Sequence, residues 1–238
     1  MFEDDSTKVR KLILFVAAVW AALALVFAIT DLQVSIAFVN PQSRWANLLE
    51  DWGRYPGAIA YISAFCILVF SRFRLFGRKL MVSQQTMVFA KVTLGVTLLN
   101  VYLFVPLTKH FWGRVRFCNL DSSFSQYTAW YLPQGPTGHE SFASGHAAEG
   151  WLLLPIGVVL FSGRSRATQV IITALSIGWG IAVAVSRVRL GAHYASDVLF
   201  SSGVGIMAFL LLCQYFSSRV KANGIEKSVQ AAPKKDAS

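Results

Sequence analysis

Apolar residues along the chain are gathered into blocks that contain almost no charged side chains. Six such blocks run over residues 12–30, 56–70, 86–107, 147–161, 169–185 and 198–216. A helix that crosses the roughly 30 Å hydrocarbon core of a bilayer needs about 20 apolar residues, because each residue adds about 1.5 Å. The first block is long enough, and the two shortest need a few flanking residues. The pattern therefore predicts an all-α, polytopic membrane protein with six transmembrane helices in one bundle.

The composition favours the same class of protein. Of the 238 residues, 55% are hydrophobic and 14% are charged, whereas about a quarter of the residues of a soluble domain are charged. A single short block is also compatible with the core of a soluble domain, but six blocks in one chain disfavour that interpretation. Residues 1–221 are predicted to form one membrane domain. Residues 222–238, rich in Lys, Gln and Ala, are predicted to form a disordered cytoplasmic tail.

The basic residues are distributed unevenly between the two sides of the predicted bundle. If the N-terminus is cytoplasmic, 14 of the 22 Lys and Arg residues fall in cytoplasmic segments, seven fall outside and Lys91 lies within the third block. This bias follows the positive-inside rule and predicts that both termini are cytoplasmic. Topology and contact with anionic lipid head groups therefore explain the net charge of +10. Nucleic acid is not an expected partner.

Three polar clusters lie on the opposite, outside face of the predicted bundle. They are KHFWGRVRF at 109–117, HESFASGHAAEGW at 139–151 and SRVRLGAHYASD at 186–197. Segments that follow odd-numbered helices of an alternating bundle share one side of the membrane. We therefore expect the three clusters to converge on one pocket at the outer membrane–water boundary.

Several residues of these clusters are suited to binding a phosphate. Lys109 offers a point charge, and Arg116 and Arg187 offer guanidinium forks, which are the usual partners of phosphate oxygens. Ser144 and Gly145 stand where a helix is predicted to begin, so that backbone N–H groups are free and a ligand has close access. The five residues predict a cradle for an anion.

Two histidines and a carboxylate supply the reactive groups. His193 and Asp197 are four residues apart, so they are neighbours on one face as the sixth helix begins. A carboxylate that accepts a hydrogen bond from one imidazole nitrogen leaves the other nitrogen free to attack. With His146 available for proton transfer, the set predicts phosphoryl transfer through a phosphohistidine. No grouping of Asp, Glu, His and Cys suggests a metal site, and no cofactor is expected.

At these residues the sequence resembles the type 2 phosphatidic acid phosphatase family, the integral-membrane lipid phosphate phosphatases. The family signature has three parts: Lys, six residues and Arg-Pro; then Pro-Ser-Gly-His; then Ser-Arg, five residues, His, three residues and Asp. The chain matches these parts at 109–116, 144–146 and 186–197, with Phe117 and Ala143 in place of the two prolines. We expect these two changes to alter loop rigidity, and not to abolish the chemistry.

The resemblance implies a role for each matching residue. His193 corresponds to the nucleophile, Asp197 to the residue that orients it, and His146 to the acid that protonates the leaving oxygen. The implied phosphate cradle consists of Lys109, Arg116, Ser144, the Gly145 amide and Arg187.

The resemblance also implies a metal-independent phosphatase of membrane lipids in the plasma (inner) membrane, with its active site facing the periplasm or cell exterior. The implied substrate lies within the bilayer and is polyprenyl diphosphate, lipid A phosphate, phosphatidylglycerol phosphate or phosphatidic acid, and the arginine-rich clusters favour the first two. Two alternatives stay open: transfer of the phosphate to another lipid, and a non-enzymatic transporter that binds the anion. The pairing of His193 with Asp197 favours the enzyme, because a binding protein needs no nucleophile.

Four further charged residues have weaker assignments. Arg114 and Arg189 are expected at the rim of the pocket, and a contact with a second phosphate is the alternative. Lys91 is expected to snorkel or to pair with a polar neighbour, because a charge within a membrane span is costly. Glu149 follows His146 by one helical turn, so it is either a solvated helix-start residue or a residue that tunes the histidine.

Overall fold

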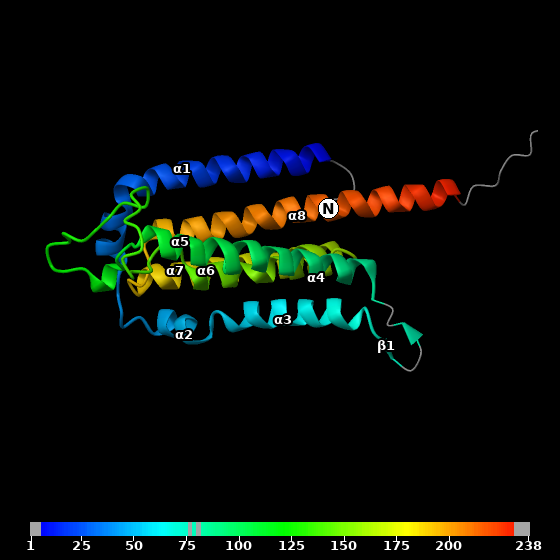
Figure 1. Cartoon of the computed structure of the whole chain (residues 1–238), viewed down its shortest axis with the longest axis horizontal. Coiled ribbons are helices and arrows are strands. Elements are labelled where there is room, and N and C mark those ends of the chain that lie inside the picture. The colour runs from blue at the N-terminus through cyan, green and yellow to red at the C-terminus, as the bar shows by residue number, and fades with distance from the viewer. Residues whose placement is uncertain (1–5, 76–77, 80–81, 231–238) are drawn as a thin grey trace, which may run out of the picture.

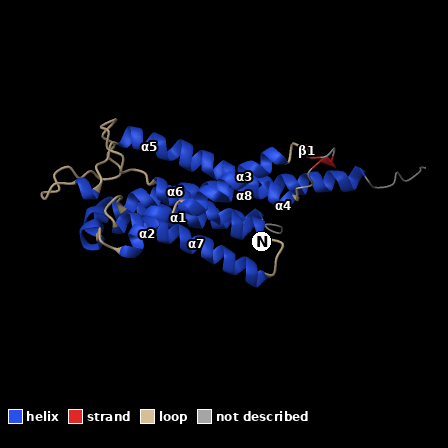
Figure 2. Cartoon of the chain, turned by 90° about the horizontal axis from the view of Figure 1, so that it is seen from below, coloured by secondary structure: helices blue, strands red, loops and turns tan. Residues whose placement is uncertain are grey.

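The computed structural model describes residues 6–75, 78–79 and 82–230, and these form a bundle of helices along one long axis (Figure 1). The α-helices are α1 (Ser6–Phe38), α2 (Arg44–Trp52), α3 (Tyr55–Phe70), α4 (Gln84–Val96), α5 (Val105–Trp112), α6 (Gly145–Gly150), α7 (Arg166–Arg189) and α8 (Ala195–Gln230). Short π- or 3-10-helical segments are η1 (Thr97–Phe104), η2 (Phe117–Asn119), η3 (Trp151–Leu153) and η4 (Ile156–Leu160). The predicted all-α bundle is confirmed, and Figure 2 shows how completely helices dominate the fold.

The remaining regular structure is a small antiparallel hairpin. Strands β1 (Arg74–Leu75) and β2 (Arg78–Lys79) pair with Arg74 opposite Lys79. The hairpin lies at one end of the bundle, and the long loop 113–144 covers the other end (Figure 1). The two ends of the bundle therefore differ in structure.

Five helical stretches of the described residues are long and apolar enough to cross a bilayer. They are Thr7–Phe38, Arg44–Phe70, Gln84–Asn119, Arg166–Arg189 and Ala195–Phe216. The fourth predicted block instead forms a shorter helical stretch, Gly145–Leu160. All six predicted blocks are thus helical, and five of them reach spanning length.

The short fourth stretch is the centre around which the bundle packs. Its regular helix is interrupted before η4 by Pro155, which lacks the N–H that an α-helical ladder requires. Its residues Trp151 and Leu152 are buried together with α4 and α8 side chains such as Phe89 and Phe209. Because other helices enclose this stretch, it is stabilised by close packing and does not need the length of a helix that faces lipid.

The outer helices have the opposite character and expose large apolar side chains. Phe15, Leu25 and Ile29 of α1 are all more than half exposed, as is Leu175 of α7. Such extended apolar surface is typical of helices that face lipid. The chain is therefore a membrane protein, and its polar groups do not lie on the outer surfaces of these helices.

The end of the chain differs from the sequence-based prediction. The predicted disordered tail spans 222–238, but α8 continues to Gln230. Ala, Lys, Glu and Gln are good helix formers, so the apolar helix continues into this polar segment. The structure thus extends α8 over residues 222–230, where disorder was predicted. The cytoplasmic tail stays a prediction, and residues 231–238 lie outside the described part of the chain.

Close packing of α7 on the fourth stretch predicts opposite effects for two glycines of α7. A Cβ at Gly180 would lie 2.7 Å from the Trp151 ring, whereas a Cβ at Gly178 would meet no atom within 4 Å. Gly180→Ala should destabilise the protein by about 1–3 kcal/mol through overpacking. Gly178→Ala should be neutral or stabilise the helix by up to about 1 kcal/mol. Thermal unfolding in detergent measures both, and equal melting temperatures would contradict this packing.

Candidate active site

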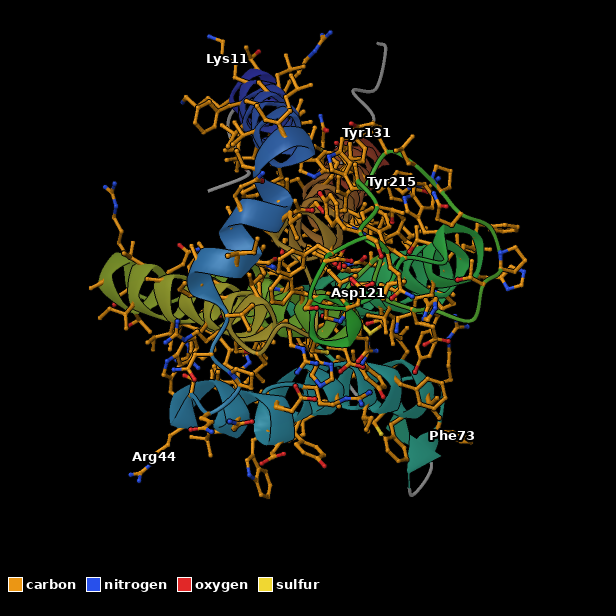
Figure 3. All side chains as sticks on the ribbon, turned by 90° about the vertical axis from the view of Figure 1, so that its left-hand side faces the viewer. Lys11, Arg44, Phe73, Asp121, Tyr131 and Tyr215 are labelled. Atoms are coloured by element: carbon orange, nitrogen blue, oxygen red, sulfur yellow. The ribbon has the colours of Figure 1, made fainter. Side chains whose placement is uncertain are left out.

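The three polar clusters meet at the end of the bundle that loop 113–144 covers. This end carries the C-terminal end of α5, the start of α6, the end of α7 and the start of α8 (Figure 1). Figure 3 looks onto this end, with Asp121 of the loop in front of the bundle and Arg44 of α2 at its edge. Hydrogen bonds join the clusters directly, because Ser144 N donates to Asp197 O at 3.2 Å and Ser141 N donates to Arg114 O at 3.0 Å.

His193 is held by a carbonyl oxygen as well as by a carboxylate. Its Nδ1 lies 2.6 Å from the Ser141 carbonyl oxygen and 3.5 Å from Oδ2 of Asp197. A carbonyl only accepts hydrogen bonds, so Nδ1 carries the hydrogen and Nε2 keeps its lone pair. The arrangement therefore fixes the tautomer in which the lone pair of Nε2 is free.

Burial also keeps this ring neutral. The His193 residue is 2% exposed. Desolvation lowers the pKa of His193 below its ordinary value, although the hydrogen bond to Asp197 and the charge of Asp197 act in the opposite direction. The ring is therefore unprotonated near pH 7.

Asp197 accepts hydrogen bonds at both of its oxygens. Its Oδ2 accepts from Ser141 Oγ at 2.5 Å and from Tyr194 N at 2.9 Å. Its Oδ1 accepts from Arg114 at 2.6 Å. Asp197 thus positions His193 by its own charge and also through Ser141, whose carbonyl holds the ring.

Arg114 is not at the rim of the pocket. It is 1% exposed and donates to Asp197, to Asp31 Oδ2 at 2.8 Å and to Ser196 Oγ at 2.8 Å. Its guanidinium carbon lies 3.9 Å from the centre of the Tyr194 ring. The sequence-based expectation was wrong because Asp31, directly after the first apolar block, provides a buried partner that no motif indicates.

The predicted cradle residues differ in burial and in their present partners. Arg187 is buried and forms an ion pair with Glu50. Lys109 Nζ lies 3.3 Å from Glu140 Oε2. Arg116 is half-buried. Two of the three cations therefore already hold a carboxylate.

Electrostatic interactions connect these residues to both histidines. The half-buried His146 ring lies within range of four groups: Arg54, Lys109, Arg116 and His193. His193 in turn interacts with Arg116 and Arg187. The structure thus brings the predicted catalytic residues and the predicted cations together at one end of the bundle.

Ser144 and Gly145 begin α6 as the sequence predicts. Ser144 Oγ accepts a hydrogen bond from Ala147 N at 3.4 Å and so caps the helix. The hydroxyl acts as an acceptor in this bond, so its own hydrogen can still be donated to another oxygen. A Cβ at Gly145 would contact only Val105, at 3.8 Å, so this position is open on the side of the helix start.

Glu149 is paired, and its partner was not recognised from the sequence. Arg54 donates from Nε and from its terminal nitrogen to the two oxygens of Glu149, at 2.9 and 3.0 Å. The two residues lie 95 positions apart, so no local spacing indicates the pair. Since Glu149 follows His146 by one turn, the pair brings Arg54 next to that histidine.

Two other cations have structural partners. Arg189 is half-buried and donates to the Phe38 carbonyl oxygen at 2.6 Å, which ties the end of α7 to the end of α1. Its expected place at the rim of the pocket stays a prediction. Lys91 lies 5.6 Å from the centre of the Phe216 ring, so its neighbour is aromatic. Among the described residues, no group of three or more His, Cys, Asp or Glu side chains is arranged to hold a metal ion.

Three comparisons relate the chain to known proteins. A family model described as "PAP2 superfamily" matches residues 90–221, which include all three clusters. Phosphatidylglycerophosphatase B of Haemophilus influenzae is 36% identical over 81 residues, which make up 33% of this chain and 32% of that protein. A similar solved structure is the first transmembrane PAP2 type phosphatidylglycerolphosphate phosphatase from Bacillus subtilis, with a TM-score of 0.48 and 19% identity over 90% of this chain and 96% of that chain.

The lowered pKa of His193 predicts a pH-dependent stability. Below about pH 6.5 the unfolded chain binds a proton that the buried ring does not bind, so the free energy of unfolding should fall as the pH decreases. Between pH 7.5 and 5.5, the wild-type melting temperature should therefore fall further than that of His193→Asn. Equal decreases in the two proteins would show that burial does not keep this ring neutral.

Proposed function

Because the chain belongs to the PAP2 superfamily, we propose that it is an integral-membrane phosphatase that hydrolyses the phosphate monoester or diphosphate of a membrane lipid. One observation carries this proposal. The Nδ1 of His193 is engaged by the Ser141 carbonyl at 2.6 Å, which leaves Nε2 as a neutral nucleophile within range of Arg116 and Arg187. A site that only binds phosphate has no need for a nucleophile held in this tautomer.

In the first half-reaction, Nε2 of His193 attacks the phosphorus and the bond to the lipid oxygen breaks. Burial and the neighbouring cations lower the pKa of His146 to about 4, and the negative charge of a bound phosphate raises it again. The protonated His146 then donates its proton to the leaving oxygen, so that the lipid departs as an alcohol or, from a diphosphate, as a monophosphate. Lys109, Arg116 and Arg187 offset the charge on the three equatorial oxygens. The carboxylates of Glu140 and Glu50, which contact Lys109 and Arg187 here, occupy positions where an anion is favoured.

In the second half-reaction, water attacks the phosphorus of phospho-His193. His146, now unprotonated, accepts a proton from this water, and inorganic phosphate leaves as the bond to Nε2 breaks. Asp197 stabilises the positive charge that the His193 ring carries while it is phosphorylated. His193 is thus neutral and free of phosphate again, and His146 is protonated, for the next cycle.

The proposed active site faces the non-cytoplasmic side of the plasma (inner) membrane. The hairpin with Arg74, Arg78 and Lys79 lies at the opposite end of the bundle (Figure 1), as the positive-inside rule requires of a cytoplasmic end. Trp45, Trp52 and other exposed aromatic residues near the site are typical of the membrane–water interface. A lipid phosphate at that depth reaches the histidines while its tail stays in the bilayer.

The candidate substrates are phosphatidylglycerol phosphate, polyprenyl diphosphate, lipid A phosphate and phosphatidic acid. The sequence favours a diphosphate substrate because the clusters are rich in arginine. In the structure, Arg114 and Arg189 donate to protein groups, so fewer arginines are free to bind a second phosphate and this preference is weaker. The matching stretch of phosphatidylglycerophosphatase B makes phosphatidylglycerol phosphate the first substrate to test.

Replacement of the proposed nucleophile should abolish turnover. His193→Asn should release no inorganic phosphate from any lipid of this panel, because no side chain remains to accept the phosphoryl group. His110→Asn, at an exposed histidine at the end of α5, is the matched control and should retain wild-type activity. Phosphate release in detergent micelles measures both variants, and normal turnover by folded His193→Asn would refute the mechanism.

Removal of one cradle cation should slow the chemical step. Arg116→Ala should lower kcat by about 10²- to 10³-fold, the usual effect of losing a group that stabilises transition-state charge. Arg44→Ala removes an exposed arginine at the same end of the bundle and should change kcat less than twofold. A loss of less than fivefold in Arg116→Ala would exclude the proposed role.

A further inference from the structure

Two aspartates share one arginine beneath the proposed nucleophile. Arg114 donates to Asp31 at 2.8 Å and to Asp197 at 2.6 Å, and both carboxylates are 0% exposed. Asp31 comes from α1, Arg114 from the segment after α5, and Asp197 from the first turn of α8. Residues far apart in the sequence are therefore joined in one buried cluster behind His193.

The hydrogen bonds indicate that both carboxylates are ionised. Oδ1 of Asp31 accepts from Ser196 N at 2.9 Å, and Oδ2 accepts from Arg114 and from Ser196 Oγ. Both oxygens of Asp197 likewise accept from donors. A carboxyl group whose two oxygens only accept hydrogen bonds is in its charged form.

Asp31, Asp197 and Arg114 together carry a net charge of −1, and this net charge acts on the nearby His193 ring. A guanidinium paired with Asp197 alone would cancel the carboxylate that stabilises a positive imidazole ring. Asp31 offsets Arg114, so Asp197 is held firmly by a cation and its field still acts on the ring 3.5 Å away. Arg114 supplies geometry, and Asp31 compensates for the charge that Arg114 brings.

We infer that Asp31 and Arg114 are positioning residues of the proposed phosphoryl transfer, which act through Asp197 to stabilise the positive ring formed when His193 attacks. The inference rests on the proposed function. It extends the catalytic apparatus to α1, which lies outside the matched residues 90–221. Neither residue contacts the reacting atoms, so their effect is on the rate of the chemical step and not on lipid binding.

A purely structural role of the same cluster makes a different prediction. If Asp31 only anchors α1 to the bundle, its loss should affect stability, and a second loss in the cluster should add further damage. If Asp31 maintains the charge at Asp197, removing the Arg114 charge as well should restore the net value of −1. A second substitution that increases activity is expected only from the charge-compensation role.

The experiment compares Asp31→Asn, the double variant Asp31→Asn/Arg114→Gln and the control Asp51→Asn, which makes the same change at an exposed residue of α2. In Asp31→Asn, Arg114 keeps Asp197 as a partner, so no buried charge is left alone. We expect kcat to fall about 10- to 100-fold, as for a slightly misplaced catalytic group, with KM within twofold. The double variant should regain at least fivefold over Asp31→Asn, and Asp51→Asn should match the wild type.

The pH dependence of kcat/KM also distinguishes the two roles, because a purely structural role of Asp31 would leave it unchanged. The charged and titratable groups around His193 are Asp197, Arg116, Arg187 and His146, and those around Asp31 are Arg114, Asp197 and the phenols of Tyr127 and Tyr194. Loss of the Asp31 charge makes protonation of His193 harder. The acidic limb of kcat/KM should therefore move to lower pH in Asp31→Asn and return in the double variant.

Three results would overturn the inference. They are a kcat of Asp31→Asn within twofold of the wild type, no recovery in the double variant, and an acidic limb that does not move. If Asp31→Asn does not fold, Asp31→Glu replaces it: a tenfold loss of kcat at an unchanged melting temperature supports positioning, and an unchanged kcat contradicts it. Failure of the proposed function is separate, since an active His193→Asn or a wild type that releases no phosphate would indicate it.

Discussion

A carboxylate that is fully removed from water is stable only when donors surround it, and Asp197 meets this condition with Arg114, Ser141 and a backbone amide. The bonds that stabilise it also build the site. Ser141 is fixed so that its carbonyl holds His193, and Arg114 is fixed so that it joins α1 to α8. If this one charge were removed, Arg114, Ser141 and His193 would lose the carboxylate that all three contact.

The lipid surroundings explain why these groups are confined to one end. Helices that face hydrocarbon must carry apolar side chains outward, and polar groups are tolerated only in the interior or at the boundary. The bundle therefore keeps an apolar core around Trp151 and Leu152 and collects its reactive residues beneath loop 113–144. Carboxylates from three places in the chain, Glu50, Glu140 and Glu149, already pair with cations there.

The sequence predicts the motif residues well because their spacing is local and the alternation of helices assigns them to one side. Lys109, Arg116, His146, His193 and Asp197 are brought to one end of the bundle as expected, while their chemical roles stay predictions. The Asp31–Arg114 pair was not predicted, because the partners lie 83 positions apart and no periodic rule relates them. A lone aspartate within an apolar helix was the available signal, since a buried charge requires a partner. The irregular fourth helix was not predicted either, although Pro155 within the fourth block was a signal for it.

The central claim is that a histidine, held as one tautomer by a carbonyl and a clamped carboxylate, carries the phosphoryl group. The most direct test is to quench the protein during turnover of a lipid labelled with radioactive phosphate and to locate the label by peptide mapping. The account predicts an acid-labile, alkali-stable phosphohistidine at position 193. Label on any other residue, or turnover with no covalent label under conditions that preserve phosphohistidine, would contradict it.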